Sequence, residues 1–148
     1  MEDSDLPTRP RSLGRLVNFA AGAVNAMCNR MLEPHGLSLP QWVVLSALWQ
    51  KAPLTVGQIA DYSGNNLPAT SKLIDRMVDK GLLARQQDPA DRRTIWISLT
   101  DRSEDLRHLK GFHETVNRRI ADGLSTTETD SLFSLLEHIE RACQDPER

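Results

Sequence analysis

The sequence is poor in the residues that mark several classes of protein. Aromatic residues make up 5% of it, and glycine and proline number eight each, which argues against a sandwich of many short strands or a fibrous chain. Two cysteines, Cys28 and Cys143, cannot build a disulfide framework, so we expect a cytoplasmic protein. The uncharged stretch 16–29 is too short to span a bilayer and its apolar residues recur at helical spacing, so we expect no membrane segment.

The sequence also lacks an overall positive charge. Its formal net charge is −2, so a nucleic-acid partner would have to be met by a local patch. Residues 65–102 contain such a patch, with seven basic and five acidic side chains, whereas residues 103–148 are acidic. The positive excess therefore lies in one segment of the chain.

Motifs for catalysis, cofactors and metals are missing as well. There is no Gly-rich phosphate loop, no GxSxG and no HExxH, so we expect neither an enzyme nor a cofactor. The four histidines are dispersed, which does not favour a metal site. They are His35, His108, His113 and His138.

The 148 residues, 39% hydrophobic and 26% charged, are typical of one folded domain, which we expect to cover residues 1–148. Residues 1–11 are polar and contain two prolines, so we expect a flexible arm there. A first helix is predicted to begin after Ser12 and to end before Pro34. Residues 39–50 are apolar on most sides of a helix, which predicts a central position in the fold.

The next stretch predicts two short helices followed by a hairpin. The helix 56–63 opens with a capping box and ends at a glycine, and the helix 66–80 starts at an asparagine cap. Two strands, 82–87 and 95–99, flank the charged turn DPADRR, and the second strand alternates polar and apolar residues.

Two more helices are predicted at the carboxyl end. One long helix begins at Thr100 or Asp101 and ends at Gly123, and a last helix follows the capping box that starts at Ser125. The last helix is expected to bury an apolar stripe of Leu132, Leu135, Leu136, Ile139 and Cys143. The fold class is therefore mainly α with a small β-hairpin wing, in the order α-α-α-α-β-β-α-α.

Two short helices, a tight turn and a hairpin are the parts of a winged helix-turn-helix, which we place at residues 39–100. Such a unit puts its second helix in the major groove of DNA and its hairpin at the neighbouring minor groove. Small and polar side chains at the start of the helix suit this position, since Asn pairs with adenine and a Thr methyl packs on thymine. The predicted contacts from the helix are Asn65, Asn66, Ala69, Thr70, Ser71, Lys72 and Arg76.

The stretch 54–101 resembles the MarR family of bacterial transcriptional regulators, most specifically in DRMVDKGLLARQQDPADRRTIWISLT. The resemblance implies that Arg92 or Arg93 of the wing enters the minor groove and that Asp91 braces a basic neighbour. It also implies a homodimer, held by a helical dimerisation region at 12–34 and 101–143, that releases its operator on binding a small ligand or on thiol oxidation.

The sequence departs from the family in two places. Many members have a glycine shortly after the LT of the return strand, where this chain has Ser103, so the start of the long helix stays open. The reactive cysteine of the thiol-sensing members lies near the start of the first helix, whereas Cys28 lies well inside it. The thiol mechanism therefore does not transfer, and we expect Cys28 to be a packing residue.

Three large side chains have two interpretations. Met27, Met31 and Trp42 are most simply core residues, but the resemblance also allows them to line a pocket for an apolar, often aromatic ligand. We take the chain to be a homodimeric, sequence-specific regulator of a palindromic operator, a repressor released by a small phenolic or aromatic ligand. The alternative is a winged-helix protein–protein interaction module without DNA binding, which the net charge of −2 would fit.

Overall fold

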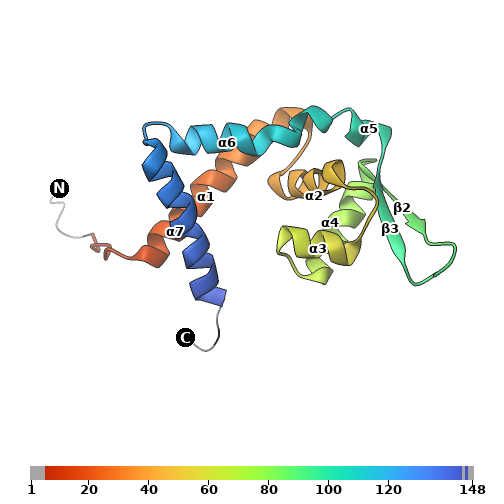
Figure 1. Cartoon of the computed structure of the whole chain (residues 1–148), viewed down its shortest axis with the longest axis horizontal. Helices are drawn as coiled ribbons and strands as arrows, with labels where there is room; N and C mark the ends of the chain where they lie inside the picture. The colour runs from red at the N-terminus through yellow and green to blue at the C-terminus, as the bar shows by residue number, and fades with distance from the viewer. Residues whose placement is uncertain (1–5, 145, 147–148) are drawn as a thin grey trace. The chain divides into compact units, whose positions relative to one another are not determined.

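The computed structural model describes residues 6–144 and 146 (Figure 1). The chain divides into two compact units, and the boundary between them in the sequence falls after His108. The first unit contains α1 (Leu13–Leu32), the 3-10 helix η2 (Glu33–His35), α2 (Leu39–Gln50), β1 (Leu54–Thr55), α3 (Val56–Ser63), α4 (Leu67–Asp79), β2 (Leu83–Gln87), β3 (Ile95–Leu99) and α5 (Asp101–Glu104). The 3-10 helix η3 (Arg107–Gly111) crosses the boundary, and the second unit contains α6 (Phe112–Ala121) and α7 (Thr126–Gln144). The expected fold class, mostly helical with a small antiparallel sheet, is confirmed.

Side-chain caps set the starts of the predicted helices. Ser12 Oγ accepts a hydrogen bond from Arg15 N at 3.3 Å and begins α1, and α2 spans the predicted residues. Thr55 and Gln58 form both hydrogen bonds of the predicted capping box at the start of α3. These caps satisfy backbone N–H groups that a helix leaves without an internal partner. Of the predicted arm at residues 1–11, residues 1–5 lie outside the described residues, and residues 6–11 carry no helix or strand.

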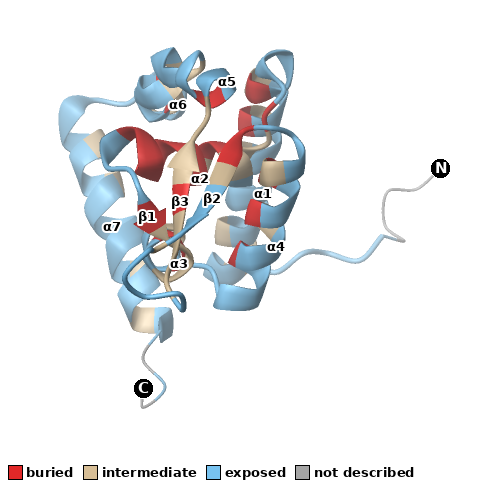
Figure 2. Cartoon of the chain, turned by 90° about the vertical axis from the view of Figure 1, so that its right-hand side faces the viewer, coloured by how far each residue is buried: buried red, intermediate tan, exposed pale blue. Residues whose placement is uncertain are grey.

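The core of the first unit is centred on α2, as predicted from its apolar sequence. Seven residues of this helix are buried, and Cys28 and Leu32 of α1 are buried with them (Figure 2). Cys28 therefore packs in the core, and desolvation by burial raises the pKa of its thiol. The raised pKa keeps the sulfur protonated and less nucleophilic.

The sheet has three antiparallel strands in the order β1-β3-β2. The predicted hairpin is confirmed, with Leu83 opposite Leu99 and Gln87 opposite Ile95. The strand β1, which pairs Leu54 with Ile97, was not predicted. Two residues are too few to show an alternating pattern, so only the pairing itself reveals this strand.

The prediction of one long helix from residue 100 to Gly123 is wrong, because α5, η3 and α6 replace it. The backbone carbonyl of Ser103 accepts hydrogen bonds from Trp49 Nε1 at 3.1 Å and from Leu106 N at 3.2 Å. A continuous α-helix would instead pair this carbonyl with the N–H four residues later, that of Arg107. The hydrogen bond from Trp49 of α2 to the carbonyl of Ser103 thus lies at the point where the predicted long helix is interrupted.

The second unit leaves many of its large apolar side chains exposed within one chain. Among its described residues α7 has none that is buried, and Leu135 and Leu136 are 60% and 49% exposed. The expectation that the last helix buries its apolar stripe is therefore wrong for the isolated chain.

No helix among the described residues has the length and apolar character needed to cross a membrane.

Candidate nucleic-acid interface

The helix α4 presents its first turn in a fixed geometry. The preceding helix α3 ends at Gly64, whose φ of 73° is a conformation that favours glycine. Asn66 then caps α4, and its Oδ1 accepts a hydrogen bond from Ala69 N at 2.8 Å. Pro68 lies in the first turn, where its missing N–H costs little. The 13 residues of α4 span about 20 Å, which is enough to cross a groove of DNA.

The two sides of α4 differ in burial and chemistry. Ile74 and Met77 are completely buried against the rest of the first unit. The opposite side is exposed and carries nearly all the residues that the sequence predicted to contact DNA. These exposed residues are Ala69, Ser71, Lys72 and Arg76, together with Pro68 and Asp75, and Asn65 and Asn66 are exposed just before the helix. Leu67, the first helical residue, is exposed as well, although its spacing places it on the side of Ile74.

Thr70 is an exception, and its predicted contact with a base is wrong. Its side chain is 1% exposed, and its hydroxyl donates a hydrogen bond to the backbone carbonyl of Asn66 at 2.8 Å. A methyl group buried in the core cannot pack on a thymine. The spacing of Thr70, Ile74 and Met77 is that of one helix face, which is a sequence signal that the prediction missed.

The turn of the wing is held by its two aspartates. Asp88 accepts hydrogen bonds from Trp96 Nε1 at 3.0 Å and from Ala90 N at 2.8 Å. The Trp96 bond first, and then the Ala90 bond, lower the pKa of Asp88 below its usual value. Asp91 accepts from the backbone N–H of Arg93 at 3.1 Å and pairs with the Arg93 guanidinium at 3.5 Å, which agrees with the bracing role that the resemblance implied.

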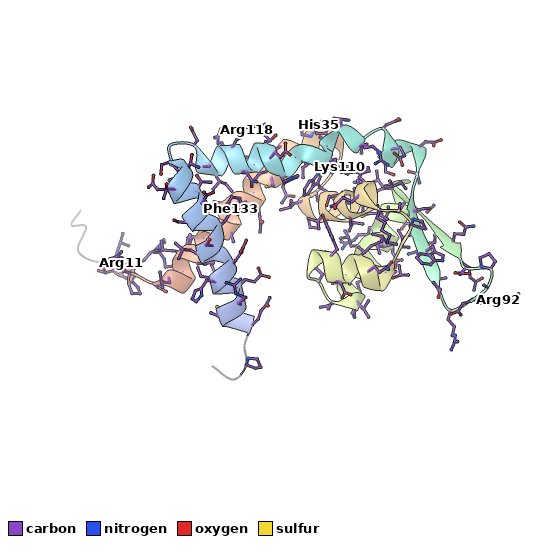
Figure 3. The ribbon with its side chains drawn as sticks, viewed as in Figure 1. Arg11, His35, Arg92, Lys110, Arg118 and Phe133 are labelled. Atoms are coloured by element: carbon purple, nitrogen blue, oxygen red, sulfur yellow. The ribbon has the colours of Figure 1, made fainter. Side chains whose placement is uncertain are left out.

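Both arginines of the wing are exposed, and Figure 3 shows Arg92 at the far end of the hairpin. The side chain of Arg93 is 94% exposed even though it pairs with Asp91. The wing therefore carries two positive charges into solvent. A narrow minor groove has an enhanced negative potential, and arginine side chains are favoured there.

An ion pair that the sequence did not predict links α4 to the wing. Asp75 of α4 pairs with Arg85 of β2 across a shallow groove that Ser71 and Ile95 also line. Because the two partners belong to different elements, this contact orients the hairpin relative to the exposed side of α4. The spacing of residues in the sequence cannot reveal this ion pair, since Asp75 and Arg85 lie on different elements.

The residues that follow the wing are anchored to the ends of two helices. Thr100 Oγ1 donates to Gly81 O and Arg102 Nη1 donates to Lys80 O, each at 2.6 Å, just beyond the carboxyl end of α4. Arg107 Nη1 donates to Trp49 O at 2.9 Å, near the carboxyl end of α2. Carbonyls at a helix end lack internal partners and favour cations, so these contacts stabilise both helix ends.

The three residues predicted to line a ligand pocket lie on α1 and α2. Trp42 is buried, and Met27 and Met31 are partly buried, which fits the core interpretation and leaves the pocket a prediction.

The ring centroids of His35 and His108 lie 5.8 Å apart, although the two residues are distant in the sequence. Within residues 6–144 and 146, no group of three or more His, Cys, Asp and Glu side chains could hold a metal ion.

The geometry defines a class of protein. The helices α3 and α4 are joined at a tight turn, and α4 exposes a polar face. The strands β2 and β3 of the three-stranded sheet form a charged hairpin. Together these elements form a winged helix-turn-helix.

Comparison with known proteins identifies the family. The profile of the MarR family matches residues 37–95. The HTH-type transcriptional regulator MgrA of Staphylococcus aureus is 31% identical over 109 residues, which cover 73% of each chain. The HTH-type transcriptional regulator YkoM of Bacillus subtilis is 32% identical over 133 residues, which cover 86% of this chain and 84% of that one. The chain belongs to the MarR family, and it is a transcriptional regulator rather than an enzyme.

The fold agrees with this assignment. A crystal structure of MepR of S. aureus in complex with DNA superposes with a TM-score of 0.83 at 21% identity, and the match covers 91% of this chain and 100% of that one. At this sequence identity, the likeness shows that the two chains share a fold.

Proposed function

We propose that this regulator is a homodimer that reads a palindromic operator in the cytoplasm and represses transcription until a small phenolic or aromatic ligand releases it. Each protomer would place α4 in the major groove and its wing at the adjacent minor groove, with the two reading helices about 34 Å apart. The observation that carries this proposal is the common exposure of Arg92, Arg93 and the polar side of α4.

The charges favour DNA over a protein partner. Lys72 and Arg76 project from the same helix as the small residues of its first turn, so cations flank the surface that would meet base edges. The wing adds Arg92 and Arg93 at its tip. MepR, a chain of the same fold, was crystallised in complex with DNA, which supports DNA as the partner.

The exposed apolar residues support a homodimer. Leu13, Leu16 and Phe19 on α1, and Phe133, Leu135 and Leu136 on α7, are all among the exposed large hydrophobic side chains. Exposed apolar side chains that gather on one helix mark interaction surfaces, and a second copy of the chain offers the same side chains in return.

The ligand would act through the arrangement of the two DNA-binding heads. A ligand shifts an equilibrium only by its differential affinity for the two states, so it must bind better when the heads are wrongly spaced for the operator. Met27, Met31 and Trp42 supply apolar and polarisable surface on α1 and α2 that suits an aromatic molecule.

A binding experiment on the wing tests the proposal. DNA recovered by footprinting the region upstream of the protein's own gene, or selected from a random library, would be titrated at several salt concentrations. We expect Arg92→Ala with Arg93→Ala to weaken binding and to reduce the salt dependence by about one to two charges per half-site. The matched control replaces Arg118 and Arg119, the adjacent arginine pair of α6. Repeating the footprint with a panel of phenolic compounds tests release.

The alternative interaction module makes the opposite prediction. If the intact protein shows no salt-dependent affinity for any duplex, the DNA-binding proposal fails and the winged helix serves a protein partner. Binding that weakens equally with the control pair would show that the wing has no special role.

A further inference from the structure

We propose that Leu67 determines base specificity by packing against the C5-methyl group of a thymine in the major groove. This inference rests on the proposed function and assigns a contact that Thr70, buried in the core, cannot make.

Leu67 is the one large aliphatic side chain of the winged region, residues 39–100, that is exposed. Between residues 39 and 100, all of which the structure describes, the exposed large hydrophobic side chains are Tyr62 at 50% and Leu67 at 55%. The hydroxyl of Tyr62 is held by hydrogen bonds with Ser46 Oγ and Gln50 Nε2, each at 3.1 Å. The isobutyl group of Leu67 has only apolar surface to offer, so removing it from water against an apolar group of a partner would be favourable.

The position of Leu67 in α4 is that of a base-contacting residue. It is the first residue of the helix, and the first residues of a recognition helix reach base edges. By helical spacing Leu67 lies on the same side of α4 as Ile74, about two turns earlier. Ile74 and Met77 are completely buried, whereas Leu67 is 55% exposed, so it stands at the open end of the helix, before the buried stripe begins.

The backbone that carries Leu67 is rigid. Asn66 Oδ1 accepts from Ala69 N, and Asn66 O accepts from Thr70 N at 3.1 Å, which closes the first turn on both sides of Leu67. Pro68 restricts the next φ angle. Because this backbone is already ordered, binding need not order it, and the entropy cost of the contact is confined to the rotamers of the leucine side chain.

The chemistry of the groove selects thymine. The thymine C5-methyl is the apolar group that the major groove presents on a base edge, while the other groups there are hydrogen-bond donors and acceptors. Pro68 and Ala69 are small and exposed beside Leu67, so they allow close approach. Asn65, Ser71 and Lys72 supply the polar contacts that a leucine cannot make.

Removing the methyl group from DNA tests the contact directly. Duplexes selected from a random library with the full chain would carry deoxyuridine in place of each thymine in turn, which keeps the base pairing and deletes only the methyl. We expect one position per half-site at which this change weakens binding by about fourfold. Leu67→Ala should lose a similar factor on the thymine duplex and should show no further loss on the deoxyuridine duplex.

Two further variants complete the test. Leu67→Met keeps an apolar contact and should remain sensitive to the methyl group, whereas Leu6→Ala removes an exposed leucine outside both the winged region and the helical dimerisation region and should leave binding unchanged. Thermal unfolding of each variant checks that the fold is intact, and the deoxyuridine scan of the natural chain needs no variant at all.

The outcomes separate this inference from the proposed function. If the natural chain selects and binds a duplex but no deoxyuridine position matters, or if Leu67→Ala keeps the full sensitivity, the thymine contact is overturned while DNA binding stands. If no duplex is selected, both proposals fail, and Leu67 is left as an apolar contact for a protein partner.

Discussion

Thr70 and Leu67 show at the scale of single residues why polarity alone misassigns a DNA contact. Threonine has both a methyl and a hydroxyl group, and its hydroxyl bonds to a backbone carbonyl four residues earlier, so it is buried without an unsatisfied group. Leucine belongs to the core by type, yet Leu67 comes before the buried stripe of α4 begins. The helical position, rather than the residue type, decides which of the two meets solvent.

Asn66 has two roles that a pair of substitutions separates. We expect Asn66→Ala to lower the free energy of unfolding by about 1 kcal/mol because the cap of α4 is lost. Asn66→Asp keeps the cap and should leave stability nearly unchanged, but it adds a negative charge beside phosphates and should weaken DNA binding by about tenfold. Urea unfolding and fluorescence anisotropy measure the two effects.

The matched control for Asn66 is Ser12→Ala, which removes the cap of α1. It should destabilise the chain by a similar amount without a direct effect on DNA binding. Equal DNA affinity for Asn66→Asp and the natural chain would place Asn66 away from the phosphates.

At the scale of elements, the sequence predicts the helix ends that are set by contacts between neighbouring residues. Helices with a side-chain cap, such as α2 and α3, begin where the pattern indicates, and α3 also ends at its predicted glycine, Gly64. The strand β1 and the break between α5 and α6 depend on partners far along the chain, namely Ile97 for Leu54 and Trp49 for Ser103. No local pattern encodes such contacts.

The wing depends on the charge of Asp88. The hydrogen bonds from Trp96 and Ala90 lower the pKa of this carboxyl below 3.8, so the folded state favours its charged form. Their stabilising effect is complete above the ordinary pKa and is lost as the pH falls through the lower, folded value. We expect the indole N–H resonance of Trp96 in NMR spectra to shift with a midpoint below pH 3.8.

Two comparisons make this titration specific to the wing. The indole resonances of Trp42 and Trp49, which lie in the core, report whether the first unit stays folded over the same pH range. In Asp88→Asn the Trp96 resonance should no longer titrate with that midpoint. A midpoint at or above 3.8 in the natural chain would contradict the role of Asp88.

At the scale of the whole molecule, the sequence predicted the family features of the site but not their tertiary supports. The exposed side of α4 and the arginines of the wing follow from local patterns, and the structure exposes them. The Asp75–Arg85 ion pair joins elements that the sequence treats separately. The apolar stripe of α7 was read correctly as apolar, but its exposure in one chain shows that periodicity does not say what covers a helix.

A charge on α7 tests the proposed dimer. We expect Leu135→Glu to raise the dimer dissociation constant by about tenfold or more, because a carboxylate would be buried without a partner. Its side chain is 60% exposed in the single chain, so the fold of the protomer should survive. Analytical ultracentrifugation measures the assembly, and DNA affinity should fall with it.

Ser134→Glu is the control for this charge, since residue 134 lies on the polar side of α7. It should leave the dimer intact. A monomeric natural chain, or a dimer indifferent to Leu135→Glu, would remove α7 from the interface.

The anchoring of residues 100–107 to backbone carbonyls near the ends of α2 and α4 has one more consequence. The contacts from Thr100, Arg102 and Arg107 bypass the sheet, so we expect a displacement of α4 to move α5 with it and a displacement of α2 to move the start of η3. The helices α2 and α4 and the segment that follows the wing would therefore move together as one rigid group.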